Sequence, residues 1–133
     1  MIRNGEYPPN IEQIVEVFPR ALKPGVIFAY GIDIYNPTGK PVPAEIVAHE
    51  QVHQTRQIAM GVESWWGYYL RSPEFRYHEE LLAHVEEFKT LAQGMMRNLR
   101  RVALKHVAKR LSAPLYEYDI SFERAKADIK KLI

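Results

Sequence analysis

Apolar residues recur at helical spacing along most of this chain, and prolines or glycines separate the repeats. Each repeat predicts an amphipathic helix with one buried stripe. The first is preceded by Asn10, a favourable N-cap with Gln13 placed to complete a capping box, and it ends at Pro19. The residues expected on its buried side are Ile11, Ile14, Val15 and Phe18.

The next segment has a strand pattern. Residues 26–35 are rich in β-branched and aromatic side chains, and Pro24-Gly25 and Asn36-Pro37 bound them. This composition predicts one strand, or two strands broken near Gly31 by a bulge or turn. The residues expected on one face are Val26, Phe28, Tyr30, Ile32 and Ile34.

From Ala44 onward the pattern is helical. One helix is predicted from about Ala44 to Ala59, because Pro43 and Glu45 suit a first turn and Gly61 follows the end. A compact aromatic segment, residues 65–70, predicts a short helix packed in the core.

Three further helices are expected after Ser72-Pro73, which combines a capping serine with a proline in the first turn. Gly94 weakens or breaks the first of them, Ser112-Ala113-Pro114 stops the second, and Ser121 caps the third. Their predicted buried stripes are Leu81, Val85, Phe88 and Ala92, then Leu99, Val102, Ala103, Val107 and Leu111, then Phe122, Ala125, Ile129 and Leu132.

These elements predict an α+β fold that is mainly helical, with a short β-hairpin or small sheet before the helix of residues 44–59. A length of 133 residues, with 47% hydrophobic and 26% charged residues, fits one folded domain over residues 1–133. No apolar run is long enough for a signal peptide or a membrane span. We therefore expect a cytoplasmic location.

The chain contains no cysteine, so any metal ion must be held by His, Asp or Glu. The motif His-Glu-x-x-His occurs at residues 49–53, within the helix predicted from Ala44. Helical spacing places His49 and His53 one above the other, where both rings can reach one metal ion. Glu50, one position further round, can contact a water molecule on that metal. This pattern is typical of zinc hydrolases.

A catalytic zinc ion normally has a third protein ligand. A histidine six residues after His53 is excluded, because Ala59 stands there. The alternative is a glutamate from the helix that follows Ser72. Measured at about 100° per residue, Glu80 lies at the edge of the apolar stripe whereas Glu79 points away from it. Glu80 is therefore favoured, with His78 as a weaker rival.

The surroundings of these residues resemble a known family. Phe75-Arg76-Tyr77 before Glu80-Leu81-Leu82-Ala83 is similar to the glutamate helix of gluzincin metallopeptidases. The fuller run resembles small metallopeptidases of bacteriophages and prophages, sometimes called minimal gluzincins. The segments that carry this resemblance are residues 34–37, residues 49–54, Trp66, residues 69–70, residues 75–76 and residues 111–116.

The resemblance implies a zinc metallopeptidase with ligands His49, His53 and Glu80, Glu50 as the catalytic carboxylate, Zn²⁺ as cofactor and a peptide or protein as substrate. A phage origin implies the host cytoplasm or the virion as location. Larger gluzincins often carry an acid just after the alanine, where this chain has His84. His84 is either a hydrogen-bond partner of the ligands or a partly buried histidine.

Two other functions remain open: a catalytically silent zinc module with a structural or virion role, and a nucleic-acid-binding protein. The second rests on the stretch between Glu87 and Glu117, which has no acid. Within it Arg97, Arg101, Lys105 and Lys109 form a positive ridge at four-residue intervals. The absence of interleaved aromatics argues against nucleic acid. A solvated face, or a complement to Glu79, Glu86 and Glu87, is the favoured interpretation.

For a peptidase reaction the sequence offers candidates, but no assignment, for the group that stabilises the oxyanion. These candidates are Tyr68, Tyr69, Tyr77 and Arg76. The edge of the strand segment, residues 26–35, could add an extended peptide substrate as a further strand.

Overall fold

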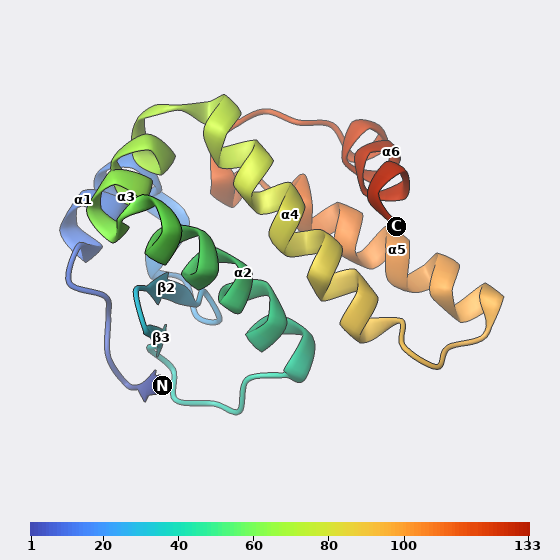
Figure 1. Ribbon diagram of the computed structural model, residues 1–133, viewed down its shortest axis with the longest axis horizontal. Coiled ribbons are helices and arrows are strands. Elements are labelled where there is room, and N and C mark those ends of the chain that lie inside the picture. Colours follow the sequence, from blue (N-terminus) through green and yellow to red (C-terminus); the bar gives the residue numbers. More distant parts are fainter.

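Two long antiparallel helices, α2 (Ala44–Met60) and α4 (Pro73–Leu91), lie side by side at the centre of the molecule (Figure 1). This description rests on a computed structural model of residues 1–133. The short α3 (Val62–Arg71) connects them. On one side are α1 (Ile11–Val17), the 3₁₀ turn η1 (Pro19–Leu22) and a small sheet. On the other are α5 (Arg97–Leu111), the 3₁₀ turn η2 (Pro114–Tyr116) and α6 (Phe122–Leu132).

The predicted α+β, mainly helical fold is confirmed, including a hairpin before α2. β2 (Phe28–Tyr30) pairs antiparallel with β3 (Asp33–Asn36), and Gly31 supplies the positive φ of 62° at the turn. Because the chain reverses there, residues 26–34 do not share one face, and Ile32 is 75% exposed. β1 (Ile2–Asn4), which pairs parallel with β3, was not predicted because three exposed residues carry no alternating pattern.

Most predicted helix ends are confirmed. Gly61, with φ of 95°, ends α2, and Gly94 separates α4 from α5. The Ser72 and Ser121 hydroxyls accept hydrogen bonds from the third amide of their helices, at 3.2 and 3.1 Å. The capping box at Asn10 is wrong: the helix begins after it, but the Asn10 side chain accepts no capping hydrogen bond.

Two apolar clusters flank the α2–α4 pair. One joins α4, α5 and α6, and the other joins α1, β2 and α3, where Trp65, Trp66 and Tyr69 are buried as predicted for the aromatic segment. The stripe predicted for α5 is partly wrong, because Leu99 and Val102 are 51% and 64% exposed. The first turns of α5 extend past the end of α4 (Figure 1), so Ala103, Leu104, Val107 and Leu111 form the buried contact instead. On α6, Leu132 at the free end is also exposed.

None of the helices combines the length with the apolar character that a bilayer span needs.

Candidate metal centre

The four residues singled out by the motif and by helical geometry meet between α2 and α4. His49, Glu50 and His53 are each 4% exposed and Glu80 is 2% exposed. His49 Nε2 lies 3.3 Å from Glu80 Oε1, and His53 Nε2 lies 3.0 Å from Glu80 Oε2. Ala83, one turn after Glu80, is fully buried, and its small side chain suits the close approach of the two helices. Among the acids of α4, Glu80 is the one that meets both rings, and its role as a ligand stays a prediction.

Glu87 orients the first histidine. Its Oε1 lies 2.8 Å from His49 Nδ1, and its Oε2 accepts a 2.8 Å hydrogen bond from Arg110 Nε. Burial opposes ionisation of this carboxyl, but the bond with His49 and the nearby charges lower the pKa of Glu87 to about 2. A carboxylate on the far nitrogen of a ligand histidine fixes both its tautomer and its ring orientation.

Sequence reasoning did not assign this role to Glu87. The signal was present, since Glu87 lies seven residues after Glu80 and therefore on the same face of α4. The resemblance to larger gluzincins instead pointed to the position of His84, where those proteins often carry an acid.

The Glu80 carboxylate is held in place from α3. Tyr69 donates a hydrogen bond of 2.6 Å from its hydroxyl to Glu80 Oε2. Burial alone would favour the neutral acid, but His53 and His49 outweigh it and hold the pKa of Glu80 well below its usual range. Glu80 is thus an ionised carboxylate facing two imidazoles.

His84 is a fully buried histidine whose Nδ1 lies 2.7 Å from the backbone oxygen of Glu80. Burial and the nearby His49 lower the pKa of His84 to about 3, so the ring is neutral and Nδ1 donates the proton. The side chain of His84 bonds to the backbone of α4 and not to the carboxylate of Glu80, because its Nδ1 lies 3.5 Å from Glu80 Oε1. It steadies the turn that presents Glu80.

This donor set requires a positive charge at its centre. When neutral His49 donates from Nδ1 to Glu87, its Nε2 presents a lone pair to Glu80 Oε1. Two acceptors then face each other in a buried site, and Glu80 Oε1 has no hydrogen-bond donor. Either added protons or a cation must lie between them. Burial disfavours a charged ring, but contacts with Glu80, Glu87 and Glu50 raise the pKa of His49 to about 10. This raised pKa has the same cause, namely that the surrounding carboxylates favour a positive charge at this point.

The dimensions suit a metal ion. One donor atom from each of the three residues lies within 4.8 Å of the others, and the two imidazole nitrogens lie 3.3 and 3.0 Å from the two carboxylate oxygens of Glu80. Around a tetrahedral zinc with bonds of about 2.0–2.2 Å, neighbouring ligand atoms are roughly 3.3–3.5 Å apart. His49, His53 and Glu80 therefore fit a divalent cation.

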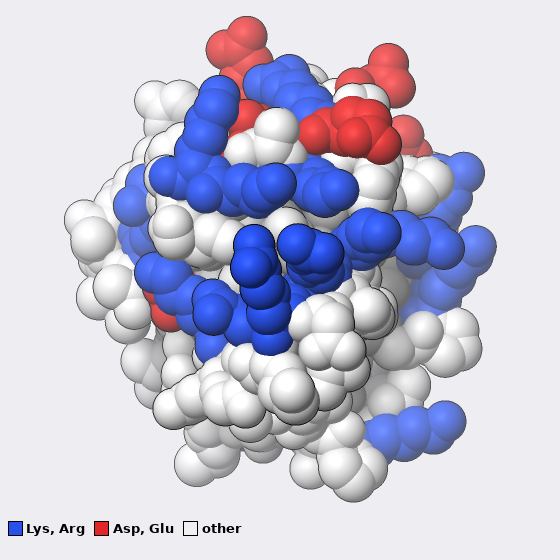
Figure 2. Space-filling model, turned by 90° about the vertical axis from the view of Figure 1, so that its right-hand side faces the viewer, with Lys and Arg blue, Asp and Glu red and all other residues white.

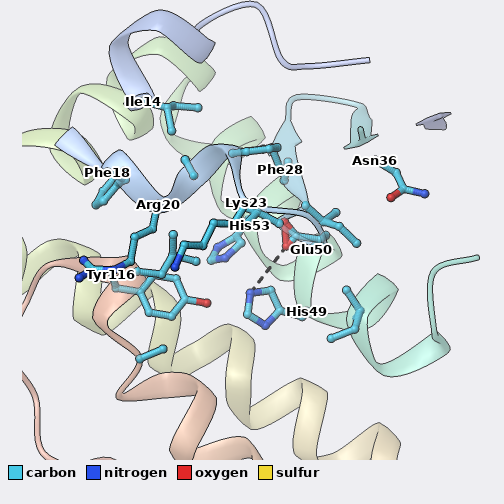
Figure 3. A pocket seen from close by; sticks show the side chains of 18 of the residues that line it. Ile14, Phe18, Arg20, Lys23, Phe28, Asn36, His49, Glu50, His53 and Tyr116 are labelled. Carbon is cyan, nitrogen blue, oxygen red and sulfur yellow. Dashed lines mark ion pairs between the residues drawn. The ribbon is translucent and has the colours of Figure 1, made fainter. Parts of the chain in front are cut away.

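Glu50 lies beside these three candidate ligands and is not one of them. Its Oε2 is 3.6 Å from His49 Nε2, the contact drawn in Figure 3. Burial, opposed by the two neighbouring histidines, raises the pKa of Glu50 above its ordinary value. A carboxylate with a raised pKa at the edge of a polar site is suited to accepting and returning a proton.

The site opens into a cleft of about 820 Å³. Apolar side chains of α1 and β2, including Ile14, Phe18 and Phe28, line one wall, and Tyr116 from η2 lines the other (Figure 3). The Arg20 and Lys23 side chains extend across the cleft between these walls. The side chains of His49, Glu50 and His53 line this cleft.

None of the four residues predicted as oxyanion donors presents a free donor group to the cleft. Tyr69 is engaged with Glu80, Tyr77 donates to Asp128 at 2.7 Å, and Tyr68 is 49% exposed outside the cleft lining. Arg76 is buried and binds backbone oxygens, including that of Tyr116 at 2.7 Å.

Tyr116 is a second phenol that lines the cleft, and its hydroxyl is free. Figure 3 shows its hydroxyl directed across the cleft toward His49, and this hydroxyl makes no hydrogen bond within the protein. Burial and the charge of Glu80 raise the pKa of Tyr116 well above its ordinary value, so the hydroxyl keeps its proton. Stacking on Tyr118 and the bond from Arg76 to its backbone fix its position.

Other acids and histidines of α4 lie outside the cluster. Glu79, which was predicted to point away from the apolar stripe, is fully buried and accepts hydrogen bonds from Arg56 and from Trp65, the latter at 2.7 Å. His78, the predicted rival ligand, has a side chain 60% exposed and contacts only Glu79.

The outer edge of β2, where a peptide substrate could add as a further strand, is partly occupied by side chains of the protein itself. The Ala29 carbonyl of β2 already accepts hydrogen bonds from the Gln57 and Trp66 side chains, at 2.9 and 3.2 Å. A peptide cannot pair with β2 at that residue.

Comparison of the chain with protein-family models, curated proteins and solved structures found no match.

Proposed function

We propose that this protein is a zinc-dependent hydrolase and that its substrates are peptides. The observation that carries the proposal is the convergence of His49, His53 and Glu80 on one buried point, with Glu50 beside them at the floor of an open cleft. Two histidines and one carboxylate from the protein leave a coordination position free, as in catalytic zinc sites.

A zinc ion held there would supply Lewis acidity, making water acidic near neutral pH and polarising a carbonyl group. The protein's own groups perform the remaining steps. Glu50 accepts the proton as water attacks the scissile carbonyl and returns it to the leaving amine. The Tyr116 hydroxyl donates a hydrogen bond to the oxygen that becomes negative. Glu87 and Tyr69 keep His49 and Glu80 in position throughout.

The cleft favours a substrate with an apolar side chain near the reacting bond. Its wall is formed by Ile14, Phe18 and Phe28, all buried, and a groove of about 820 Å³ accommodates several residues of a peptide. A silent zinc module would not need such an opening over its metal ligands.

Replacing Glu50 by Gln tests the proposal. The side chain keeps its shape but cannot take a proton, so we expect the zinc content to stay near one ion per chain. Hydrolysis of a peptide library should fall by at least about 100-fold, the usual scale of a general base.

The matched control is Gln51→Glu, which alters charge at the neighbouring exposed position of α2. A Glu50→Gln protein with full activity would refute the assigned role of Glu50. Zinc-loaded wild-type protein that cleaves no peptide would instead favour the structural zinc module.

A further inference from the structure

The outer side of α5 and α6 carries a dense group of basic side chains. Figure 2 faces this side, the right-hand side of Figure 1, and shows Lys and Arg extending in a band across it. We call this set the basic face. Its exposed members on the two helices are Arg97, Arg100, Arg101, Lys105, Lys109, Lys130 and Lys131.

The charge of the basic face is not neutralised within the protein. None of its members comes within 4.0 Å of a carboxylate, whereas Arg110 of the same helix binds Glu87. The acids expected to complement it are used elsewhere: Glu87 and Glu79 are buried in other contacts, and Glu86 pairs with Lys89. On these two helices Arg110 pairs with Glu87 and Arg124 pairs with Asp128, and the members of the basic face are left for an external anion.

The arrangement is regular. Arg97, Arg101, Lys105 and Lys109 follow one another at four-residue intervals, about 6 Å apart along the helix axis at 1.5 Å per residue. All four side chains are exposed, and the row turns by about 40° round the helix axis at each four-residue step. An ordered row of cations suits a polymer with regularly spaced phosphates. A fluid lipid surface would not require such regularity.

The face lacks exposed Phe, Tyr or Trp side chains that could stack on bases. α5 contains no aromatic residue, and Phe122, the aromatic residue of α6, packs against the core. Single-strand binders use exposed aromatics for stacking, whereas phosphate contacts alone hold a duplex without sequence preference. We propose that the basic face binds double-stranded nucleic acid through its phosphates. This site is separate from the metal centre and does not depend on the proposed hydrolase function.

Fluorescence anisotropy with 20-base-pair DNA and RNA duplexes, titrated between 50 and 200 mM salt, tests the proposal. In the double variant Arg101→Glu and Lys105→Glu we expect duplex affinity to fall at least tenfold. The slope of log affinity against log salt should shrink by about two, because each lost phosphate contact removes about 0.9.

The control Lys40→Glu with Arg71→Glu changes the net charge equally, at exposed positions on other segments. It should alter affinity by less than threefold. Circular dichroism establishes that both proteins are folded, and Lys105→Gln with Lys109→Gln replaces the first variant if it is not.

Three results would overturn the proposal: no duplex binding at 50 mM salt, an equal loss in the control variant, or tighter binding to a single strand than to either duplex. Binding to phosphatidylglycerol vesicles without duplex binding would overturn it too and would identify the basic face as a lipid-binding surface.

Discussion

Helix α4 packs against two neighbours with opposite chemistry. Toward α5 and α6 it presents Val85, Phe88 and Ala92, which join an apolar cluster. Toward α2 and the residues around it, it presents Glu79, Glu80, His84 and Glu87, all buried. Apolar burial stabilises a fold without further conditions, at about 25 cal/mol per Å². Buried charges require partners or ions, and an apolar replacement is often at least as stable.

The difference teaches where to look for function. The apolar contact of α4 with α5 and α6 is explained by folding alone. The side of α4 that faces α2 concentrates buried polar groups that two packed helices do not need for folding. These groups form two sets of contacts. Glu79 is bound by Arg56 and Trp65, while Glu80 and Glu87 hold the two sides of the His49 ring. Substitutions on the two sides should therefore have separable effects on stability and on metal affinity.

The largest effect on stability is expected on the apolar side. Leu111 is fully buried among α4, α5 and α6, so Leu111→Ala should lower the free energy of unfolding by about 3–5 kcal/mol. Zinc affinity of the folded protein should stay within about threefold, because Leu111 is absent from the cleft lining and the ligand cluster. Urea unfolding and a competitive zinc chelator measure the two quantities.

Val102→Ala on the same helix serves as the control. Val102 is 64% exposed, and its truncation should change stability by less than about 0.5 kcal/mol. A loss of zinc affinity in Leu111→Ala as large as its loss of stability would show that the two sides are not separable.

Glu87→Gln should change stability less than Leu111→Ala does and, unlike that variant, should weaken zinc binding. The amide no longer neutralises Arg110 and accepts more weakly from His49, so zinc affinity should fall about 10–100-fold. The lost charge pairing should reduce stability by about 1–3 kcal/mol.

Glu86→Gln at the adjacent, half-exposed position should leave zinc affinity unchanged. If both substitutions alter it equally, Glu87 does not orient the ligand.

The sequence predicted these two sides unequally well. Helix ends and the meeting of His49, His53 and Glu80 followed from local rules, namely caps, glycines and helical angles. Which face of α5 is buried depended on where α4 ends, and so Leu99 and Val102 were misplaced. Tyr116 was missed for a similar reason: it reaches the cleft only because Arg76 ties η2 to α4, a contact between residues far apart in the sequence.

The smallest effect, and the one that separates structure from chemistry within the polar side, concerns Glu79. Burial would raise its pKa, but hydrogen bonds from Arg56 and Trp65 prevail and lower the pKa of Glu79 below its ordinary value. A carboxyl whose pKa is lower in the folded state contributes stability above its unfolded pKa. This contribution disappears as the pH falls through the folded pKa.

Glu79→Gln should therefore lower the free energy of unfolding by about 1–2 kcal/mol at pH 7. Urea unfolding at pH 7, 5, 4 and 3 should show this gap between wild type and variant closing toward the acid end, with zinc affinity at pH 7 unchanged. The same measurements on Arg56→Met and on the variant with both substitutions complete a double-mutant cycle, which gives the coupling energy between Glu79 and Arg56. This coupling energy should vanish at low pH. A coupling that persists at pH 3 would mean that Glu79 acts by packing and not by charge.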